Sequence, residues 1–364
     1  MASAIACFSG LAVFLLVSTP LSAVPPDSPA ERWLSSIKTP AWSPPADLAS
    51  WSKQRAEIRQ TLWGLLGDLP PRPPTPKVRI LSAEEGEGYR LERFVFENGA
   101  GAEVPGLCFL PKDGRERHPA ILYCHWHGGQ YDIGKQELLQ TNATPVAAGP
   151  ALARQGYVVL GIDAYCFGER NGQGPGGPEE KGSAGELTAA KFQLWAGRSL
   201  WGMILRDDLM ALDYLAARPE VDAGRIGVTG ISMGSTRAWW IMALDDRPKC
   251  GVCVACMTRY QDLIRDEMLK AHGIYYFVPG LLRHFDTEAV IACAAPRAML
   301  FMTGEKDGGS PTSGVKTIAA QVSSLYRLYG ESARFESVLY PDTGHVYLPE
   351  MWERAVKWMN ANLR

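Results

Sequence analysis

Short apolar runs alternate with helical segments along most of the chain. Two runs that are apolar throughout lie at residues 120–124 and 157–162, and a segment with helical character, 149–155, separates them. Strands that are apolar on both faces are typical of parallel sheets covered by helices on each side. Further strand-like runs lie at residues 225–229, 251–255, 298–303 and 335–340. The alternation predicts an α/β protein whose sheet is mostly parallel.

The region before these runs has a different pattern. Three strand-like runs, at residues 77–81, 90–97 and 106–110, follow one another with short gaps, which favours antiparallel hairpins. Later in the chain, residues 167–185 are rich in glycine, proline and charge and are interpreted as a long loop. Long loops inside compact domains are often functional.

Residues 24–76 form an N-terminal arm ahead of the main domain, residues 77–364. Within this arm we predict one helix from about Asp47, a suitable N-cap, to about Leu66, followed by a Pro-rich linker. The apolar positions of this helix approximate one face. Since an apolar stripe needs a partner, we expect the arm to pack on the main domain.

Residues 1–23 have the pattern of a signal peptide. They contain no charged side chain and an apolar run at 11–17, followed by Ser18-Thr19-Pro20-Leu21-Ser22-Ala23; we expect cleavage near Ala23, although Leu21 stands where a small residue is preferred. This predicts a secreted or periplasmic protein. A retained anchor is the alternative, but the run is short for a bilayer span and Pro20 interrupts it. No other segment is long and apolar enough, so no stable membrane association is expected after cleavage.

Composition sets outer limits on size, partners and redox state. A chain of 364 residues holds one large α/β domain with an additional segment, not two catalytic domains. A net charge of −2 without basic clusters speaks against nucleic acid as a partner. Eight cysteines are present, of which Cys7 would leave with the signal peptide. The remaining odd number, placed mostly in strand-like runs, favours buried free thiols over a disulfide framework.

The sequence Gly230-Ile231-Ser232-Met233-Gly234 has the form G-x-S-x-G. It directly follows the strand-like run 225–229 and directly precedes a helix-like run, which is the strand–turn–helix context of a nucleophile elbow. Ser232 is therefore the candidate nucleophile. In this context the chain is predicted to adopt the α/β-hydrolase fold, with a mostly parallel eight-stranded sheet and helices on both faces.

A serine hydroxyl needs a base, because it is a poor nucleophile at neutral pH. His345 lies just beyond the strand-like run 335–340 and just before the last predicted helix. The chain order Ser, acid, His is the order of this fold. Since His272 and His284 follow no clear strand, His345 is the predicted base.

The acid should follow the strand between the nucleophile and the base. That strand is the run 298–303, and Asp307 lies in the turn behind it. We predict that Asp307 orients His345 and stabilises its imidazolium, with Glu305 as second choice. Asp342 shares the loop of His345, which places it badly for this role.

An oxyanion that develops at the substrate needs two N–H donors. We predict that one is the amide of Met233, the residue after the nucleophile. The other should come from the loop after the run 120–124, where the amide of His127 is preferred and that of Gly128 is the alternative.

Two clusters could suggest a metal site. The pair His125 and His127 has no carboxylate or third histidine at a suitable spacing. Cys250, Cys253 and Cys256 fall on an apolar strand, whose alternate residues face opposite sides of a sheet. No metal and no cofactor are expected.

These motifs resemble the α/β-hydrolase superfamily, in particular the branch of acetyl xylan esterases, cephalosporin-type deacetylases and relatives of dienelactone hydrolase. The resemblance covers roughly residue 77 to the C-terminus. Its landmarks are His125-Trp126-His127-Gly128-Gly129-Gln130, Asp163 with Gly168-Glu169-Arg170, the segment 195–202 with Arg206-Asp207-Asp208, Gly230 to Gly234, Ala295-Pro296-Arg297, Asp307 and Gly344-His345. The resemblance implies an acyl-enzyme route through Ser232. Trp126 departs from the glycine that is usual there, and a serine replaces the cysteine of dienelactone hydrolases.

The preferred function is therefore a serine carboxylic-ester hydrolase that deacetylates carbohydrate or similar small esters. The alternatives are a small serine peptidase of the prolyl-oligopeptidase type and a non-catalytic binding module. Nothing before Lys77 is long enough for the propeller of such peptidases, and the intact Ser232, Asp307 and His345 disfavour a binding module. Six aromatic residues could stack on sugar rings, although most should belong to the core: Trp195, Trp201, Trp239, Tyr260, Tyr275 and Tyr276. Residues 267–285 could form part of a cap.

Overall fold

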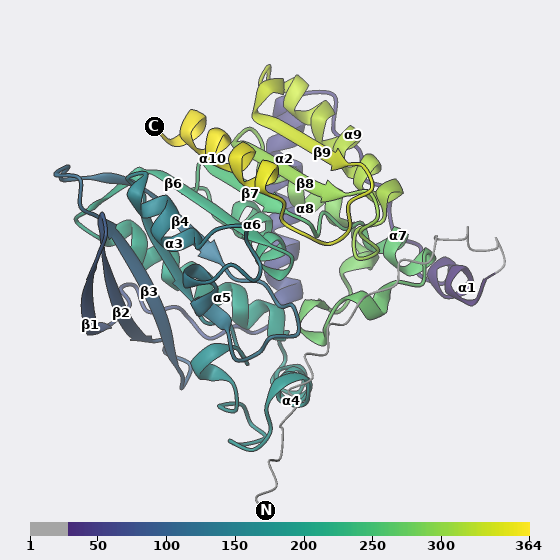
Figure 1. Cartoon of the computed structure of the whole chain (residues 1–364). Helices are drawn as coiled ribbons and strands as arrows, with labels where there is room; N and C mark the ends of the chain where they lie inside the picture. The colour runs from purple at the N-terminus through teal and green to yellow at the C-terminus, as the bar shows by residue number, and fades with distance from the viewer. Residues whose placement is uncertain (1–27) are drawn as a thin grey trace, which may run out of the picture.

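The computed structural model describes residues 28–364, which form one nine-stranded sheet between two layers of helices (Figure 1). In sheet order the strands are β1 (Val78–Gly86), β2 (Tyr89–Glu97), β3 (Glu103–Pro111), β5 (Val158–Ile162), β4 (His118–Cys124), β6 (Val221–Ile231), β7 (Cys250–Val254), β8 (Ala298–Gly304) and β9 (Phe335–Tyr340). The pairs from β1 to β5 are antiparallel, and all the pairs that follow are parallel. The predicted α/β-hydrolase fold with a mostly parallel sheet is confirmed.

The sheet has nine strands, so the expected number of eight was wrong by one. The three N-terminal strands do form antiparallel hairpins, as predicted, but all three belong to the main sheet. They extend it at one edge, where β3 pairs with β5. With these three strands included, the sheet has nine strands.

The helices are α1 (Pro29–Ser35), α2 (Leu48–Leu66), α3 (Ala148–Arg154), α4 (Gly182–Trp195), α5 (Leu200–Ala217), α6 (Met233–Leu244), α7 (Tyr260–Arg265), α8 (Thr287–Ala292), α9 (Thr312–Leu328) and α10 (Pro349–Leu363). Short 3₁₀ turns are η1 (Gly134–Leu139), η2 (Gly168–Arg170), η3 (Leu269–Ala271), η4 (Ile274–Tyr276), η5 (Leu281–Arg283) and η6 (Ser332–Arg334). The segment expected to be a loop up to residue 185 already contains the first turn of α4, so its end was placed too late.

Two apolar cores lie on opposite faces of the sheet. Every residue of β4 is buried, and its side chains alternate: Leu122 packs with α5 and α6 on one face, whereas Ile121 packs with α3 and α10 on the other. This two-sided burial explains why the central strands are apolar at every position. Because the strands from β5 to β9 in sheet order are parallel, the loops that follow them gather at one edge of the sheet.

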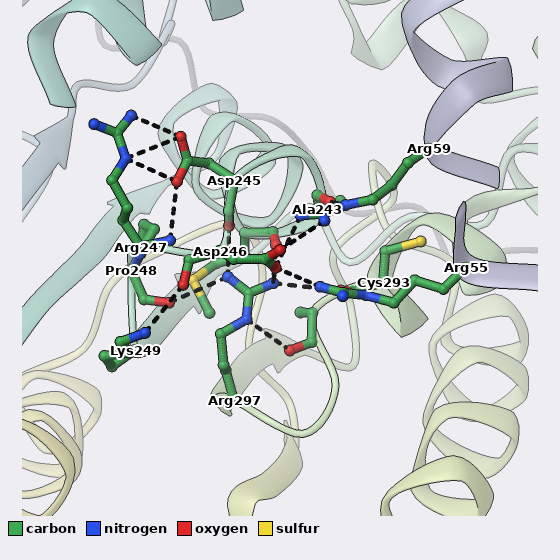
Figure 2. Close-up of polar contacts among 12 residues, drawn as sticks. Arg55, Arg59, Ala243, Asp245, Asp246, Arg247, Pro248, Lys249, Cys293 and Arg297 are labelled. Atoms are coloured by element: carbon green, nitrogen blue, oxygen red, sulfur yellow. Dashed lines mark hydrogen bonds and ion pairs between the residues drawn. The ribbon is translucent and has the colours of Figure 1, made fainter. Parts of the chain in front are cut away.

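The N-terminal helix α2 is docked on the main domain, as the apolar stripe predicted. Asp47 caps it by accepting the amide of Ser50 at 2.7 Å, and its buried residues join the larger core. On its flank, Arg59 donates to the carbonyl of Ala243 at 2.6 Å and pairs with Asp246 (Figure 2). Ala243 lies in the last turn of α6, so arginine from the arm satisfies a helix-end carbonyl there.

Several sequence-based expectations concern burial and the membrane. The seven described cysteines are all free and buried, as predicted. Across residues 28–364, no helix has the length and apolar character needed to cross a bilayer. The predicted signal peptide, residues 1–23, lies outside the described residues.

Candidate active site

Ser232 stands at a sharp turn between a strand and a helix. Strand β6 ends at Ile231 and α6 begins at Met233. Between them Ser232 has φ 58° and ψ −120°, a backbone conformation that non-glycine residues rarely adopt. The predicted strand–turn–helix context of the G-x-S-x-G motif is confirmed.

The two glycines of the motif are required by close packing against strand β4. A Cβ at Gly230 would lie 2.3 Å from the carbonyl oxygen of Cys124, and a Cβ at Gly234 would lie 1.9 Å from the same atom. Both distances are far below van der Waals contact. Any side chain at either position would therefore push the turn away from β4 and displace Ser232.

Asp307 and His345 come from loops after neighbouring parallel strands, β8 and β9, and form a hydrogen-bonded pair. Nδ1 of His345 donates to Oδ2 of Asp307 at 2.8 Å. Oδ1 of Asp307 accepts the amide of Gly309 at 2.9 Å, which fixes the plane of the carboxylate. Asp342 is exposed and pairs with Lys306, so the structure joins His345 to Asp307, the preferred acid, and not to Asp342.

The electrostatics of this pair favour an ionised acid and a stabilised imidazolium. Burial would raise the pKa of Asp307, but the charge and hydrogen bond of His345 and the Gly309 amide together lower it. Burial would likewise lower the pKa of His345, but the charge of Asp307 and its hydrogen bond raise it. A carboxylate that holds a histidine in this way stabilises the positive ring formed after proton transfer.

Ser232 and the Asp307–His345 pair lie at the same edge of the sheet, where the parallel strands β6, β8 and β9 end. Strand β7 lies between β6 and β8, and the loop after it carries Cys256. The Cys256 thiol lies 3.9 Å from Oγ of Ser232, and its pKa, raised mainly by burial, is raised further by the charge of Asp307. In open α/β sheets this carboxyl edge is where ligands bind.

The loop after β4 offers a limited set of backbone donors. The amide of Trp126 donates to Glu137 at 2.7 Å, and the amide of Gly129 donates to Nδ1 of the His127 ring at 3.0 Å. Within residues 28–364, no hydrogen bond engages the amides of His127 and Gly128. Met233 is the first residue of α6, so its amide has no acceptor within the helix. The three predicted oxyanion donors are thus compatible with this geometry, and their role stays a prediction.

The histidine pair in this loop has its ring nitrogens engaged. Nδ1 of His125 donates to the carbonyl of Trp126 at 2.7 Å, and Nε2 accepts the amide of Ala164 at 3.1 Å. In His127, Nδ1 accepts from Gly129, so Nε2 carries the proton and donates to Glu186 at 3.3 Å. These rings therefore have no nitrogen left for a metal ion, and residues 28–364 contain no cluster of three or more ligand-type side chains arranged to hold one.

The segment 267–285 contacts two loops of the site, and its role as part of a cap stays a prediction. Tyr275 stacks on His127, with ring centroids 5.0 Å apart. His272 donates to the carbonyl of Gly309, next to the loop of Asp307, at 3.0 Å. Burial, only partly offset by the Gly309 carbonyl, lowers the pKa of His272 to about 4, so this ring is neutral at physiological pH.

Sequence patterns did not identify the contacts of His272, Glu186 or Glu137 with the site, because no local pattern marks them. Of the six aromatic residues considered for sugar stacking, Trp201, Trp239, Tyr275 and Tyr276 are buried, as expected for core residues. Trp195 differs, since it is 95% exposed at the end of α4.

The fold and the nucleophile elbow define this protein as an α/β-hydrolase. The chain belongs to the Abhydrolase family, whose model matches residues 39–310 and so includes α2 of the N-terminal arm.

A Bacillus subtilis protein named as the hydrolase YtaP is 36% identical to this chain over 308 residues, which cover 84% of this chain and 98% of YtaP. Among solved structures, a Bacteroides fragilis protein assigned as an acetyl xylan esterase superposes with a TM-score of 0.67 at 18% identity, covering 93% of this chain and 90% of that one. A glucuronoyl esterase from Solibacter usitatus gives a TM-score of 0.63 at 19% identity, covering 90% and 99%. At these identities the solved structures establish the shared fold.

Proposed function

We propose that this protein is a serine carboxylic-ester hydrolase in which Ser232 is the nucleophile, His345 the base and Asp307 the residue that orients the base. The observation that carries the proposal is the hydrogen-bonded Asp307–His345 pair at the sheet edge where the strained Ser232 turn lies. Nucleophile, base and orienting acid on three loops of one edge are the parts that acyl transfer requires.

The reaction follows from these roles. Oγ of Ser232 attacks the ester carbonyl carbon while Nε2 of His345 takes the hydroxyl proton, because Asp307 holds the other ring nitrogen protonated. The amide of Met233, with that of His127 or Gly128, receives the oxygen that becomes negative. The C–O bond to the alcohol then breaks, and the alcohol leaves with the proton from His345.

Hydrolysis of the acyl-enzyme repeats these steps with water. His345 takes a proton from water as the water oxygen attacks the acyl carbon, and it returns this proton to Oγ of Ser232 when the acid departs. Each proton that His345 accepts is thus released in the same half-reaction, so no metal or cofactor is needed for balance.

The substrate class is proposed to be a neutral carbohydrate ester, with acetyl esters first. Solved relatives in fold carry the names acetyl xylan esterase and glucuronoyl esterase, which supports an ester on a sugar. The carboxylate of Glu186 lies beside His127 and disfavours an anionic group at that place. The predicted export of the protein agrees with an extracellular polysaccharide substrate.

Three substrate classes separate the proposal from its alternatives. We expect hydrolysis of p-nitrophenyl acetate and of acetylated xylo-oligosaccharides, and a weaker rate or none with aminoacyl p-nitroanilides. A methyl ester of glucuronic acid is an additional test substrate. In this ester the sugar supplies the acid, whereas in an acetylated sugar it supplies the alcohol, so the two rates show which arrangement the enzyme prefers. Each rate is compared with that of Ser232→Ala. Efficient cleavage of the anilides would favour the peptidase, and the absence of any Ser232-dependent turnover would favour a binding module.

A further inference from the structure

Glu137 is a fully buried carboxyl group that the proposed reaction does not use. It lies on η1, beyond the end of β4, and has no exposed surface. Its two oxygens accept hydrogen bonds from different elements: Oε1 from the hydroxyl of Tyr123 on β4, and Oε2 from the amide of Trp126 at 2.7 Å. One side chain therefore connects the strand to the loop that follows it.

The backbone of Trp126 is fixed from both sides. Its amide is bound by Glu137, and its carbonyl accepts a hydrogen bond from Nδ1 of His125 at 2.7 Å. His125 is itself held, because its Nε2 accepts the amide of Ala164 at 3.1 Å. The next two amides along the chain, those of His127 and Gly128, are the two candidates for the second oxyanion donor.

A buried carboxyl at this place is costly, which argues that it has a role beyond packing. Burial raises the pKa of Glu137 to about 7, against the opposing effects of the Tyr123 and Trp126 hydrogen bonds and of the Arg237 charge. Removing an ionisable group from water without a full ion pair is unfavourable. Arg237 does not supply that pair, since its guanidinium is bound to Asp208.

We propose that Glu137 is a positioning residue for the oxyanion site: by binding the Trp126 amide, it sets the orientation of the His127 and Gly128 amides toward the carbonyl attacked by Ser232. The inference rests on the proposed serine-esterase function. Glu137 also takes the Trp126 amide out of the set of possible donors. The next two amides along the chain, those of His127 and Gly128, have no acceptor among residues 28–364 and so stay available as donors.

The magnitude of the effect follows from what the amides do. Loss of one oxyanion donor costs about 10²–10³ in kcat, and a misplaced donor should cost a part of this. A donor that acts on developing charge contributes little to binding of the neutral ester, so KM should change far less than kcat. A fall in kcat with a nearly unchanged KM therefore distinguishes a positioning role from a general loss of structure.

The test compares three variants of the full-length protein with p-nitrophenyl acetate as substrate. Glu137→Leu removes both acceptors and should lower kcat about 10- to 100-fold with little change in KM. Glu137→Gln keeps an acceptor for the Trp126 amide and can donate to Tyr123, so it should retain most of the wild-type kcat. Glu288→Leu is the matched control, because Glu288 is also buried at 1% exposure and has a pKa raised to about 7, mainly by burial, but bonds to Arg259 away from this loop.

The possible results distinguish failure of the positioning role from failure of the proposed esterase function. Wild-type kcat in Glu137→Leu, or an equal loss of kcat in Glu288→Leu, overturns the positioning role while leaving the esterase intact. A wild-type protein without Ser232-dependent turnover removes the proposed function, and the inference falls with it. If Glu137→Leu does not fold, Glu137→Asp takes its place. Its shorter chain keeps the carboxyl group but should not reach both partners, so it should show the same selective loss of kcat, and wild-type kcat there would contradict the proposal.

Discussion

Replacing Asp307 by asparagine changes the hydrogen-bonding character of the proposed acid and keeps its shape. Oδ1 of Asp307 accepts the amide of Gly309 at 2.9 Å, and Oδ2 accepts Nδ1–H of His345 at 2.8 Å. Since the Gly309 amide can only donate, the asparagine must keep its oxygen there and direct its NH₂ group to His345. That group donates to Nδ1 and so forces the ring proton onto Nε2, the nitrogen that must accept the proton of Ser232.

We therefore expect Asp307→Asn to lower kcat about 10⁴-fold, by analogy with the same change in a serine-protease triad. This corresponds to about 5.5 kcal/mol in the activation barrier. The assay is kcat with p-nitrophenyl acetate at a pH well above the histidine pKa, corrected for Ser232→Ala, with thermal midpoints measured alongside. Asp342→Asn is the matched control, because Asp342 shares the loop of His345 but bonds only to Lys306 at the surface. A loss smaller than about tenfold in Asp307→Asn would refute the role of Asp307, on the scale set by the triad analogy, and would direct attention to Glu305.

Other consequences concern pH, the N-terminal arm and the elbow. The kcat/KM should rise with pH through a midpoint above 6.5, because only neutral His345 accepts a proton and its pKa is raised from that value. Arg59→Ala should lower the free energy of unfolding by about 1–2 kcal/mol, because the carbonyl of Ala243 loses its donor. Gly234→Ala should abolish activity, because its Cβ would lie 1.9 Å from the carbonyl of Cys124.

Each of these expectations has a result that contradicts it. A kcat/KM midpoint below 6.5 would mean that Asp307 does not stabilise the protonated ring. For the arm, Arg79→Ala is the control, since Arg79 and its partner Glu103 are both more than half exposed and such pairs contribute about 0.5 kcal/mol or less. Equal thermal shifts in Arg59→Ala and Arg79→Ala would show that the arm contact does not stabilise the fold. A fully active Gly234→Ala would mean that the elbow tolerates displacement.

The parts of the site that the sequence predicted are those encoded locally. The G-x-S-x-G motif carries its own strand and helix, so the turn at Ser232 could be located from residues 225–242 alone. The Asp307–His345 hydrogen bond could be expected because loops after parallel strands meet at one edge of the sheet. The alternation of fully apolar runs and helices likewise predicted the parallel sheet. A strand that is buried on both faces of a sheet is apolar at nearly every position, and this is visible in the sequence of each strand.

The parts that the sequence did not predict depend on tertiary contacts that leave no local sequence pattern. Glu137 is a polar residue in a 3₁₀ turn, and nothing in its neighbourhood reveals that it binds an amide 11 residues earlier. Glu186 lies on α4, whose start within a Gly-rich segment resembles a loop. The ninth strand was miscounted for a related reason, because strand pairing at a sheet edge is decided by partners and not by the strand's own pattern.

Covalent labelling of Ser232 tests the central claim most directly. A fluorophosphonate probe reacts with a serine only where a base activates it and oxyanion donors hold the phosphoryl oxygen. We predict that the wild-type protein gains one probe, that mass spectrometry places it on the peptide containing Ser232, and that Ser232→Ala gains none. Asp307→Asn should be labelled much more slowly than Asp342→Asn. Labelling of wild type and Ser232→Ala at equal rates, or at a different residue, would contradict the assignment of Ser232 as the nucleophile.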